Sequence, residues 1–337
     1  MKKNRAALAF CLLLAYCGGV KDSYGWPNDR RSERTAAGTN AFVFRWAKTL
    51  VSKLSGGGPY APVELSAAAL DPEHDRVYIG TSEGRFWALS GGGSKVYHYN
   101  ASAAIQSKPA FDPDRDELYF GTEDAVIHAL NASSGMLRWR AKVKGPVHQT
   151  PVLAADRLFV VTDSDQVIAL SRNDGKEIWS YRREAPDGFA IAGRAGLLEA
   201  DGKIITGFTD GMVVALDPVS GNVLWERDTS VEVEQPMGSP ERFVDIDTTP
   251  VQVDDVVYVA SFSGGVFAIE LSGGGVRWHQ NEWTGITEIV KHGDHLLVSS
   301  SDHGLIMVDL LTKRLVWKKK SSAERQAELR FWATGCW

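Results

Sequence analysis

The sequence predicts an all-β protein, a β-propeller whose blades are four-stranded antiparallel sheets. Three observations carry this prediction: a repeated pattern of apolar residues, turn residues between the apolar runs, and a constant repeat length. The clearest copy runs from Leu118 to Trp139, with Gly121 at the end of one predicted strand and Leu130 at the end of the next. Apolar runs bounded by Gly, Asn, Asp and Ser are typical of strands joined by hairpin turns.

Other copies of this repeat keep the same frame, in which an anchor residue is followed by an apolar residue at +9 and a Trp at +18. These copies are Val161–Leu170–Trp179, Gly207–Leu216–Trp225, Ala260–Ile269–Trp278 and Ser299–Val308–Trp317. Upstream, Gly80 and Leu89 keep the first spacing, and Tyr97 stands one residue short of the Trp position. Successive anchors are 41, 40, 46, 53 and 39 residues apart. Self-similarity at about 40–45 residues indicates a propeller, so we predict six recognisable blades within residues 41–317.

The repeat array favours one large propeller, and the composition is that of a globular protein without a nucleic-acid partner. The 337 residues are 44% hydrophobic and 23% charged, and 33 glycines supply the turns. The net charge of −5 gives no basic surface for nucleic acid. The three cysteines, Cys11, Cys17 and Cys336, form neither a disulfide framework nor a zinc-binding spacing.

The N-terminal segment has the pattern of an export signal. Basic residues precede an apolar run from Ala6 to Tyr16 that is too short to span a bilayer. Residues 14–18 resemble a bacterial lipoprotein box with Cys17 as the lipidated residue, although Tyr16 stands where a small residue is usual. Ordinary cleavage after Cys17 is the alternative. Either way, residues 1–17 are predicted to be a signal and the body to be exported.

The segments outside the repeats are assigned by composition. Residues 18–40 are polar and are predicted to be a flexible linker. Residues 41–50 resemble the Trp-ending strand of a repeat, and we expect Trp46 to lie in a strand that closes the propeller by pairing into its last blade. Residues 318–337 do not fit the repeat frame and remain an unassigned tail.

Two repeats are longer than the others because they carry inserts. The inserts fall around Glu184–Leu198 and Asp228–Asp247. Both occupy the link from the outermost strand of one blade to the innermost strand of the next, in successive blades, so we expect them to lie side by side. Long loops on a rigid scaffold are where function is usually found, and these inserts are therefore the candidate site.

Two motifs connect the chain to a known family. The segment Leu216–Trp225 (LDPVSGNVLW) resembles the signature of the PQQ-like propeller superfamily. Within it, Asp245–Val251 (DIDTTPV) resembles a segment of the BamB family, the propeller lipoproteins of the outer-membrane β-barrel assembly (BAM) machinery. The resemblance covers residues 41–317. It implies a non-enzymatic scaffold without cofactors at the periplasmic face of the outer membrane, lipid-anchored through Cys17. Its partners would be BamA, other BAM subunits and unfolded outer-membrane proteins.

The resemblance also implies a contact surface for BamA on two neighbouring loops, which map onto the two inserts. Asp245 and Asp247 carry over directly, and the other loop supplies Phe189 and Ile191, with Arg194 as the basic residue. Structural alternatives remain open: the two aspartates could cap a turn, and the two apolar side chains could pack back onto the fourth blade. The family ring has eight blades, whereas six repeats are readable here, so the ring is predicted to be incomplete at the C-terminal end.

Two other functions are compatible with a propeller of this class. One is a PQQ-dependent (quinoprotein) dehydrogenase, which shares the repeat; many such enzymes carry an adjacent cysteine pair, and this chain has none. The other is a generic exported propeller that binds protein or polysaccharide. The closest histidines, His292 and His295, flank Gly293-Asp294 and indicate a hairpin turn. No catalytic, metal-binding or cofactor-binding residue is predicted.

Overall fold

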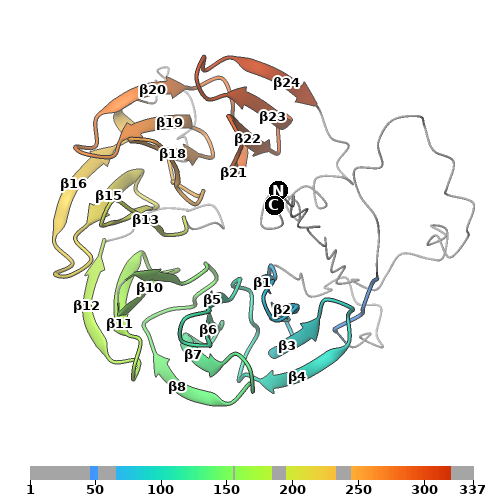
Figure 1. The fold of residues 1–337 in the computed structure, drawn as a ribbon. Helices are drawn as coiled ribbons and strands as arrows, with labels where there is room; N and C mark the ends of the chain where they lie inside the picture. Colours follow the sequence, from blue (N-terminus) through green and yellow to red (C-terminus); the bar gives the residue numbers. More distant parts are fainter. Residues whose placement is uncertain (1–45, 52–65, 155, 184–194, 233–243, 320–337) are drawn as a thin grey trace, which may run out of the picture.

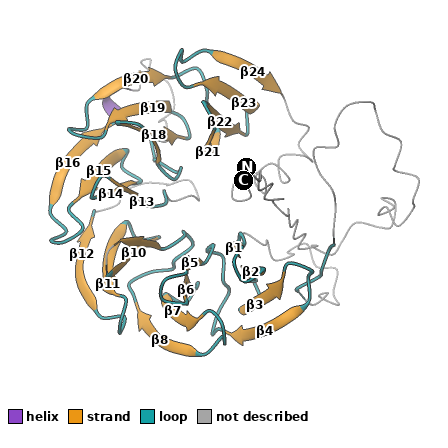
Figure 2. Ribbon diagram, in the orientation of Figure 1, coloured by secondary structure: helices purple, strands orange, loops and turns teal. Residues whose placement is uncertain are grey.

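A computed structural model describes residues 46–51, 66–154, 156–183, 195–232 and 244–319. These residues form six four-stranded sheets, and in each sheet the strands lie side by side in chain order. The sheets follow one another around a common centre as propeller blades, almost without helix (Figures 1 and 2). The structure therefore confirms the predicted all-β propeller with six four-stranded antiparallel blades.

Each blade is one continuous stretch of the chain. The first two blades are β1 (Ala69–Asp71), β2 (Arg76–Ile79), β3 (Arg85–Ser90), β4 (Lys95–Asn100), and β5 (Ala110–Asp112), β6 (Glu117–Gly121), β7 (Val126–Asn131), β8 (Leu137–Lys142). The third and fourth are β9 (Val152–Ala154), β10 (Arg157–Thr162), β11 (Gln166–Ser171), β12 (Glu177–Arg182), and β13 (Leu198–Ala200), β14 (Lys203–Gly207), β15 (Met212–Leu216), β16 (Val223–Asp228). The fifth and sixth are β17 (Val251–Val253), β18 (Val256–Ser261), β19 (Gly265–Glu270), β20 (Val276–Gln280), and β21 (Ile286–His292), β22 (His295–Ser300), β23 (Gly304–Asp309), β24 (Leu315–Lys319).

Burial along the strands explains the two kinds of sequence pattern. The second strand of a blade is buried along most of its length, and β6 along all of it, because neighbouring blades cover both of its faces. The outermost strand is buried on one side only: in β8, Trp139 is buried while Arg138 and Arg140 are exposed. Continuous apolar runs and alternating runs are the expected results of two-sided and one-sided burial.

An aromatic side chain in the outermost strand joins each of the first four blades to the blade that follows. Its ring lies against a glycine in a turn of the next blade, and its N–H or O–H group donates to a backbone carbonyl of the same turn. The donor–acceptor pairs are Tyr97 Oη to Ala132 O (2.8 Å), Trp139 Nε1 to Arg172 O (2.8 Å), Trp179 Nε1 to Pro218 O (3.1 Å) and Trp225 Nε1 to Leu271 O (2.9 Å). The glycines are Gly135, Gly175, Gly221 and Gly274.

Glycine is required in this turn for two reasons. At Gly221, φ is +75°, a left-handed conformation that side chains other than glycine adopt at a cost. A Cβ added there would also lie 2.7 Å from the ring of Trp179. The glycine of the repeat signature therefore provides the flat surface on which the Trp of the preceding blade rests.

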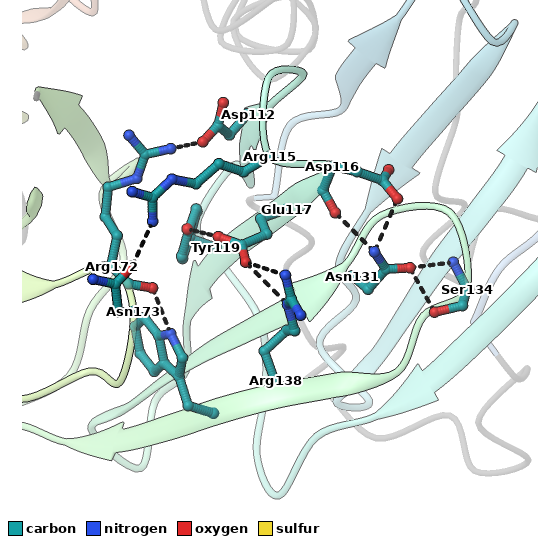
Figure 3. A network of polar contacts seen from close by, with 11 residues as sticks. Asp112, Arg115, Asp116, Glu117, Tyr119, Asn131, Ser134, Arg138, Arg172 and Asn173 are labelled. Carbon is teal, nitrogen blue, oxygen red and sulfur yellow. Dashed lines mark hydrogen bonds and ion pairs between the residues drawn. The ribbon is translucent and has the colours of Figure 1, made fainter. Parts of the chain in front are cut away.

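The junction between the second and third blades adds a buried ion pair to this contact (Figure 3). Asp112 and Arg172 are both buried and form a direct ion pair, while the carbonyl of Arg172 accepts the Trp139 hydrogen bond. Burial lowers the pKa of the Arg172 guanidinium. Nearby, Arg115 Nη1 donates to Asn173 Oδ1 at 2.9 Å. This junction is held by side chains from the β5–β6 turn, the β11–β12 turn and strand β8.

The six described blades form an arc whose two ends are the first and the sixth blade (Figure 1). Residues 46–51 lie against the first blade without forming a strand. Trp46 Nε1 donates to the carbonyl of Gly91 at 2.7 Å, and its ring covers Gly93. Trp46 thus takes the place that an outer-strand Trp takes at other junctions, but the prediction that it lies in a strand is wrong; pairing of this segment into a last blade stays a prediction.

Several predicted segments lie wholly or partly beyond the described part of the chain. Residues 1–17, 18–40 and most of the 318–337 tail belong to this group, and β24 extends two residues into that tail, to Lys319. Within the described residues, no helix has the length and hydrophobicity needed to cross a membrane.

Candidate partner-binding loop cluster

The first insert leaves the third blade and returns at the fourth, and the second leaves the fourth blade and returns at the fifth. The first links β12 to β13 and the second links β16 to β17. Residues 184–194 and 233–243 lie outside the described residues. The predicted contact residues Phe189, Ile191 and Arg194 therefore cannot be placed, and the same holds for the predicted lipidation site Cys17. The roots of both inserts are described, and they define the site.

The points where the two inserts return lie side by side; the predicted placement of the inserts next to each other concerns residues outside the described part of the chain and stays a prediction. Gly196, where the first insert returns, lies against Thr249, where the second returns: a Cβ added to Gly196 would be 2.4 Å from Thr249 Oγ1. Thr206 Oγ1 of β14 donates to the carbonyl of Gly196 at 3.0 Å. The two return points are therefore packed together on the fourth blade.

The second insert leaves the propeller through a firmly bonded segment. Thr229 is buried, and both its backbone N–H (3.1 Å) and its hydroxyl (2.7 Å) donate to the carbonyl of Gly211. Asp228 Oδ1 then accepts hydrogen bonds from the backbone N–H (2.9 Å) and the hydroxyl (2.5 Å) of Ser230. Ser230 begins a short 3₁₀ turn, Ser230–Glu232. The direction in which this insert departs is thus set by the turn containing Gly211.

The aspartate pair lies where the second insert returns, on either side of a buried isoleucine. Ile246 is 1% exposed and bridges to Ser261; its side chain covers Gly207. Asp245 is also buried, at 3% exposure, whereas Asp247 is half-buried and its backbone N–H donates to the carbonyl of Ala260 at 3.3 Å.

The burial of Asp245 has a local cause. Val244, the preceding residue, packs against Gly211, and the backbone N–H of Ile246 donates to the carbonyl of Phe208 at 3.1 Å. The segment therefore passes between a turn of the fourth blade and strand β18 of the fifth. Asp247 is half-buried as a residue, and its two carboxylate oxygens are themselves covered.

Arg183 lies at the root from which the first insert departs and bonds to side chains of the third and fourth blades. Its Nε donates to Asp210 Oδ2 at 2.6 Å, and its Nη1 reaches Tyr181 Oη at 3.2 Å and Glu226 Oε2 at 3.4 Å. Burial alone would lower the pKa of Arg183, but pairing with Asp210 and Tyr181 raises it. These two partners therefore favour the charged form of the guanidinium.

One turn takes part in contacts of both inserts. It is the turn between β14 and β15, residues Phe208–Gly211, which we call the hub turn. It receives Arg183 from the first insert and Thr229, Val244 and Ile246 from the second. Thr209, which is buried, also donates its hydroxyl to Asp165 of the third blade.

Sequence reasoning found the inserts and the aspartates but not the hub turn or Arg183. The only local signal is that Arg183 directly precedes the first insert. The described part of the cluster carries the carboxylates of Asp210, Asp245 and Asp247 and the guanidinium of Arg183. Among the described residues, no three His, Cys, Asp or Glu side chains gather where they could hold a metal ion.

Residues 90–319, well over half of the chain, match a protein-family model described as outer membrane protein assembly factor BamB. The match includes both inserts. The chain is also similar to the outer membrane protein assembly factor BamB of Yersinia pestis, with 30% identity over 204 residues, covering 57% of this chain and 51% of that protein. For the protein of the same name in Escherichia coli K12, the identity is 30% over 181 residues, covering 53% and 45%. The chain thus spans about half the length of the curated relatives it matches.

Solved structures show the same likeness. The crystal structure of BamB from Moraxella catarrhalis superposes with a TM-score of 0.67 at 25% identity, covering 77% of this chain and 76% of that one. The computationally designed protein Ika8 superposes with a TM-score of 0.59 at 17% identity, covering 75% and 73%. At that identity, the second likeness concerns the fold alone.

Proposed function

The chain belongs to the BamB family of outer membrane protein assembly factors, and from this we propose that it is a non-enzymatic scaffold that binds BamA through its loop cluster. The observation that carries the proposal is that the family match spans residues 90–319, and so includes both inserts and the aspartate segment. In this role the propeller presents two loops at a fixed separation, and binding energy comes from contacts with the partner rather than from chemistry.

The contact surface that we propose consists of the two inserts and the residues at their roots. Asp247 supplies a carboxylate at the point where the second insert returns, and a carboxylate suits a basic side chain of the partner, because charge-assisted hydrogen bonds are among the stronger polar contacts. Asp245 supports the same segment from within, and Phe189, Ile191 and Arg194 contribute from the first insert. Buried apolar anchors surrounded by polar residues are the usual composition of such an interface.

The location and the remaining partners follow from the same proposal. The protein acts at the periplasmic face of the outer membrane, anchored through a lipid on Cys17, together with the other subunits of the BAM complex. Unfolded outer-membrane proteins are its clients, and the exposed edges of the outermost strands offer them strand addition.

A pull-down from solubilised membranes tests the proposal. We expect the wild-type protein to recover BamA and Asp247→Ala to lose most of it, with Asp174→Ala, an exposed aspartate in a turn of the third blade, as the matched control. The double variant Asp245→Ala/Asp247→Ala follows, with circular dichroism to verify folding, since Asp245 is buried. Recovery by all variants would move the contact elsewhere, and no BamA with the wild type would refute the assembly role.

A further inference from the structure

The described roots of both inserts contact the same four-residue hub turn, so a shift of that turn displaces both roots together. We propose that Arg183 is a positioning residue that couples the two inserts by fixing the hub turn. Arg183 is the last described residue before the first insert, and its guanidinium bonds the side chain of Asp210 in the hub turn at 2.6 Å. The second insert touches the same turn at Phe208 and Gly211, through Thr229, Val244 and Ile246.

The side of the turn facing the first insert is held by charge. The Arg183 and Asp210 side chains are 24% and 20% exposed, so their attraction is less screened than that of a pair fully in water. Asp210 is itself oriented, because its second oxygen, Oδ1, accepts the backbone N–H of Met212 at 3.0 Å. Arg183 is oriented too, because Tyr181 Oη lies 3.2 Å from its Nη1. Each partner in the pair is therefore fixed by a second bond.

The other side of the turn is held by backbone hydrogen bonds to the second insert. The carbonyl of Gly211 accepts from Thr229, where that insert departs, and the carbonyl of Phe208 accepts from Ile246, where it returns. These two carbonyls flank Asp210 in the sequence. Their positions depend on the turn conformation that the Asp210–Arg183 pair stabilises, and the coupling runs through this turn.

The chemistry of the contact favours arginine over lysine. A planar guanidinium offers several donors in a fixed geometry and can bond three acceptors at once, whereas an ammonium on a flexible stem cannot hold the same three directions. Here the acceptors belong to β12, the hub turn and β16, since Glu226 Oε2 lies 3.4 Å from Nη1. Arg183 thus bonds the strand before each insert and the turn between them.

Hydrogen exchange of backbone amides tests the coupling, and the chain offers a matched control. Arg157 is similarly buried, at 18% side-chain exposure, and it also joins the third blade to the fourth, by donating to the carbonyls of Pro218 and Val219 in a different turn. We expect Arg183→Met to speed exchange of the Thr229 and Ile246 amides about tenfold. Arg157→Met should leave both amides unchanged, and Arg183→Lys should give an intermediate rate.

Amides of the central strand β14 serve as the reference for global stability in the same samples. If Arg183→Met speeds exchange only around Asp210 and Met212, while Thr229 and Ile246 keep their wild-type rates, the coupling is refuted. It is equally refuted if Arg157→Met accelerates the same two amides. A uniform rise that includes β14 would show a general stabilising role and would also overturn the positioning role.

A binding readout links the inference to the proposed function, on which its biological meaning rests. If the wild type binds BamA, Arg183→Met should weaken that affinity about tenfold, Arg183→Lys should restore part of it, and Arg157→Met should leave it unchanged. Equal affinity for the wild type and Arg183→Met would contradict the role of Arg183 in the interface. If the wild type does not bind BamA, the proposed function fails, while the exchange rates still decide the coupling.

Discussion

Trp225 and Trp317 occupy the same position in the fourth and sixth blades but differ in burial. Each faces the third strand of its own blade in the same register, opposite Ala215 and Met307 respectively. Trp225 is 7% exposed, whereas Trp317 is 37% exposed. The difference comes from the next blade, because Trp225 bonds to Leu271 and lies against Gly274, while no such turn covers Trp317 in the described part of the chain.

This comparison teaches that the repeat residue is stabilised by its neighbour blade rather than by its own blade. Repeat proteins show this behaviour generally: stability is approximately a sum of repeat and nearest-neighbour terms. The junction between the fifth and sixth blades is an intermediate case, because Lys313 stands where the other turns have glycine, with φ of +59°. Its Nζ donates to the carbonyl of Leu310 at 2.6 Å and lies 4.8 Å from the centre of the Tyr258 ring.

The largest expected effect comes from truncating the two tryptophans. Trp225→Ala should lower the free energy of unfolding by about 3–5 kcal/mol, because it leaves a cavity and removes the contact between blades. Trp317→Ala should cost about 1 kcal/mol or less, as expected for a partly exposed side chain. Urea unfolding followed by circular dichroism measures both variants. Equal losses would mean that each blade buries its own Trp, contrary to the comparison.

The second prediction separates the contact from the backbone conformation. Gly221 and Gly202 both have positive φ, +75° and +67°, but only Gly221 lies against a ring, since nothing is within 4 Å of a Cβ added at Gly202. Gly202→Ala should cost about 1–2 kcal/mol from the left-handed backbone alone. Gly221→Ala should cost about 1–3 kcal/mol more, because the new methyl group overpacks the Trp179 ring.

Thermal unfolding of the two alanine variants under identical conditions provides the measurement. Because the backbone penalty is common to both, the difference between their midpoints reports the junction. A difference near zero would show that the Trp shifts away without loss, so the glycine would serve the turn and not the contact between blades.

The fold was predictable from the sequence because its signals are local. The frame that ends on Trp139 depends on turn residues and on strand burial, both of which leave a pattern in neighbouring residues. Tyr97 shows the limit: it stands one residue short of the frame, yet it pairs with Ala88 as the tryptophans pair with their partners, and it donates the same junction hydrogen bond. A shorter turn shifts the spacing without changing the contact.

The site was predictable only in part, for the opposite reason. The extra length of two repeats located the inserts, and the Asp245–Val251 motif located the aspartates. The burial of Asp245 and the contact of Arg183 with Asp210 depend on which turns of neighbouring blades meet, 27 positions apart in the second case. No pattern of spacing along the chain encodes that proximity, so the hub turn emerged only from the structure.

The smallest effect is expected at Lys313, where the cost of a left-handed backbone and the gain from side-chain contacts nearly cancel. Lys313→Ala keeps the left-handed backbone and loses the contacts with Leu310 and Tyr258, so it should cost about 1 kcal/mol. Lys313→Gly loses the same contacts but relieves a backbone penalty of about 1–2 kcal/mol, so its stability should stay within about 0.5–1 kcal/mol of the wild type. Urea midpoints of the three proteins measure the balance.

If glycine is as destabilising as alanine, the lysine contacts hold the junction between the fifth and sixth blades and the backbone strain is negligible. If glycine restores or exceeds wild-type stability, that junction follows the same rule as the others, with Lys313 offsetting the loss of the glycine.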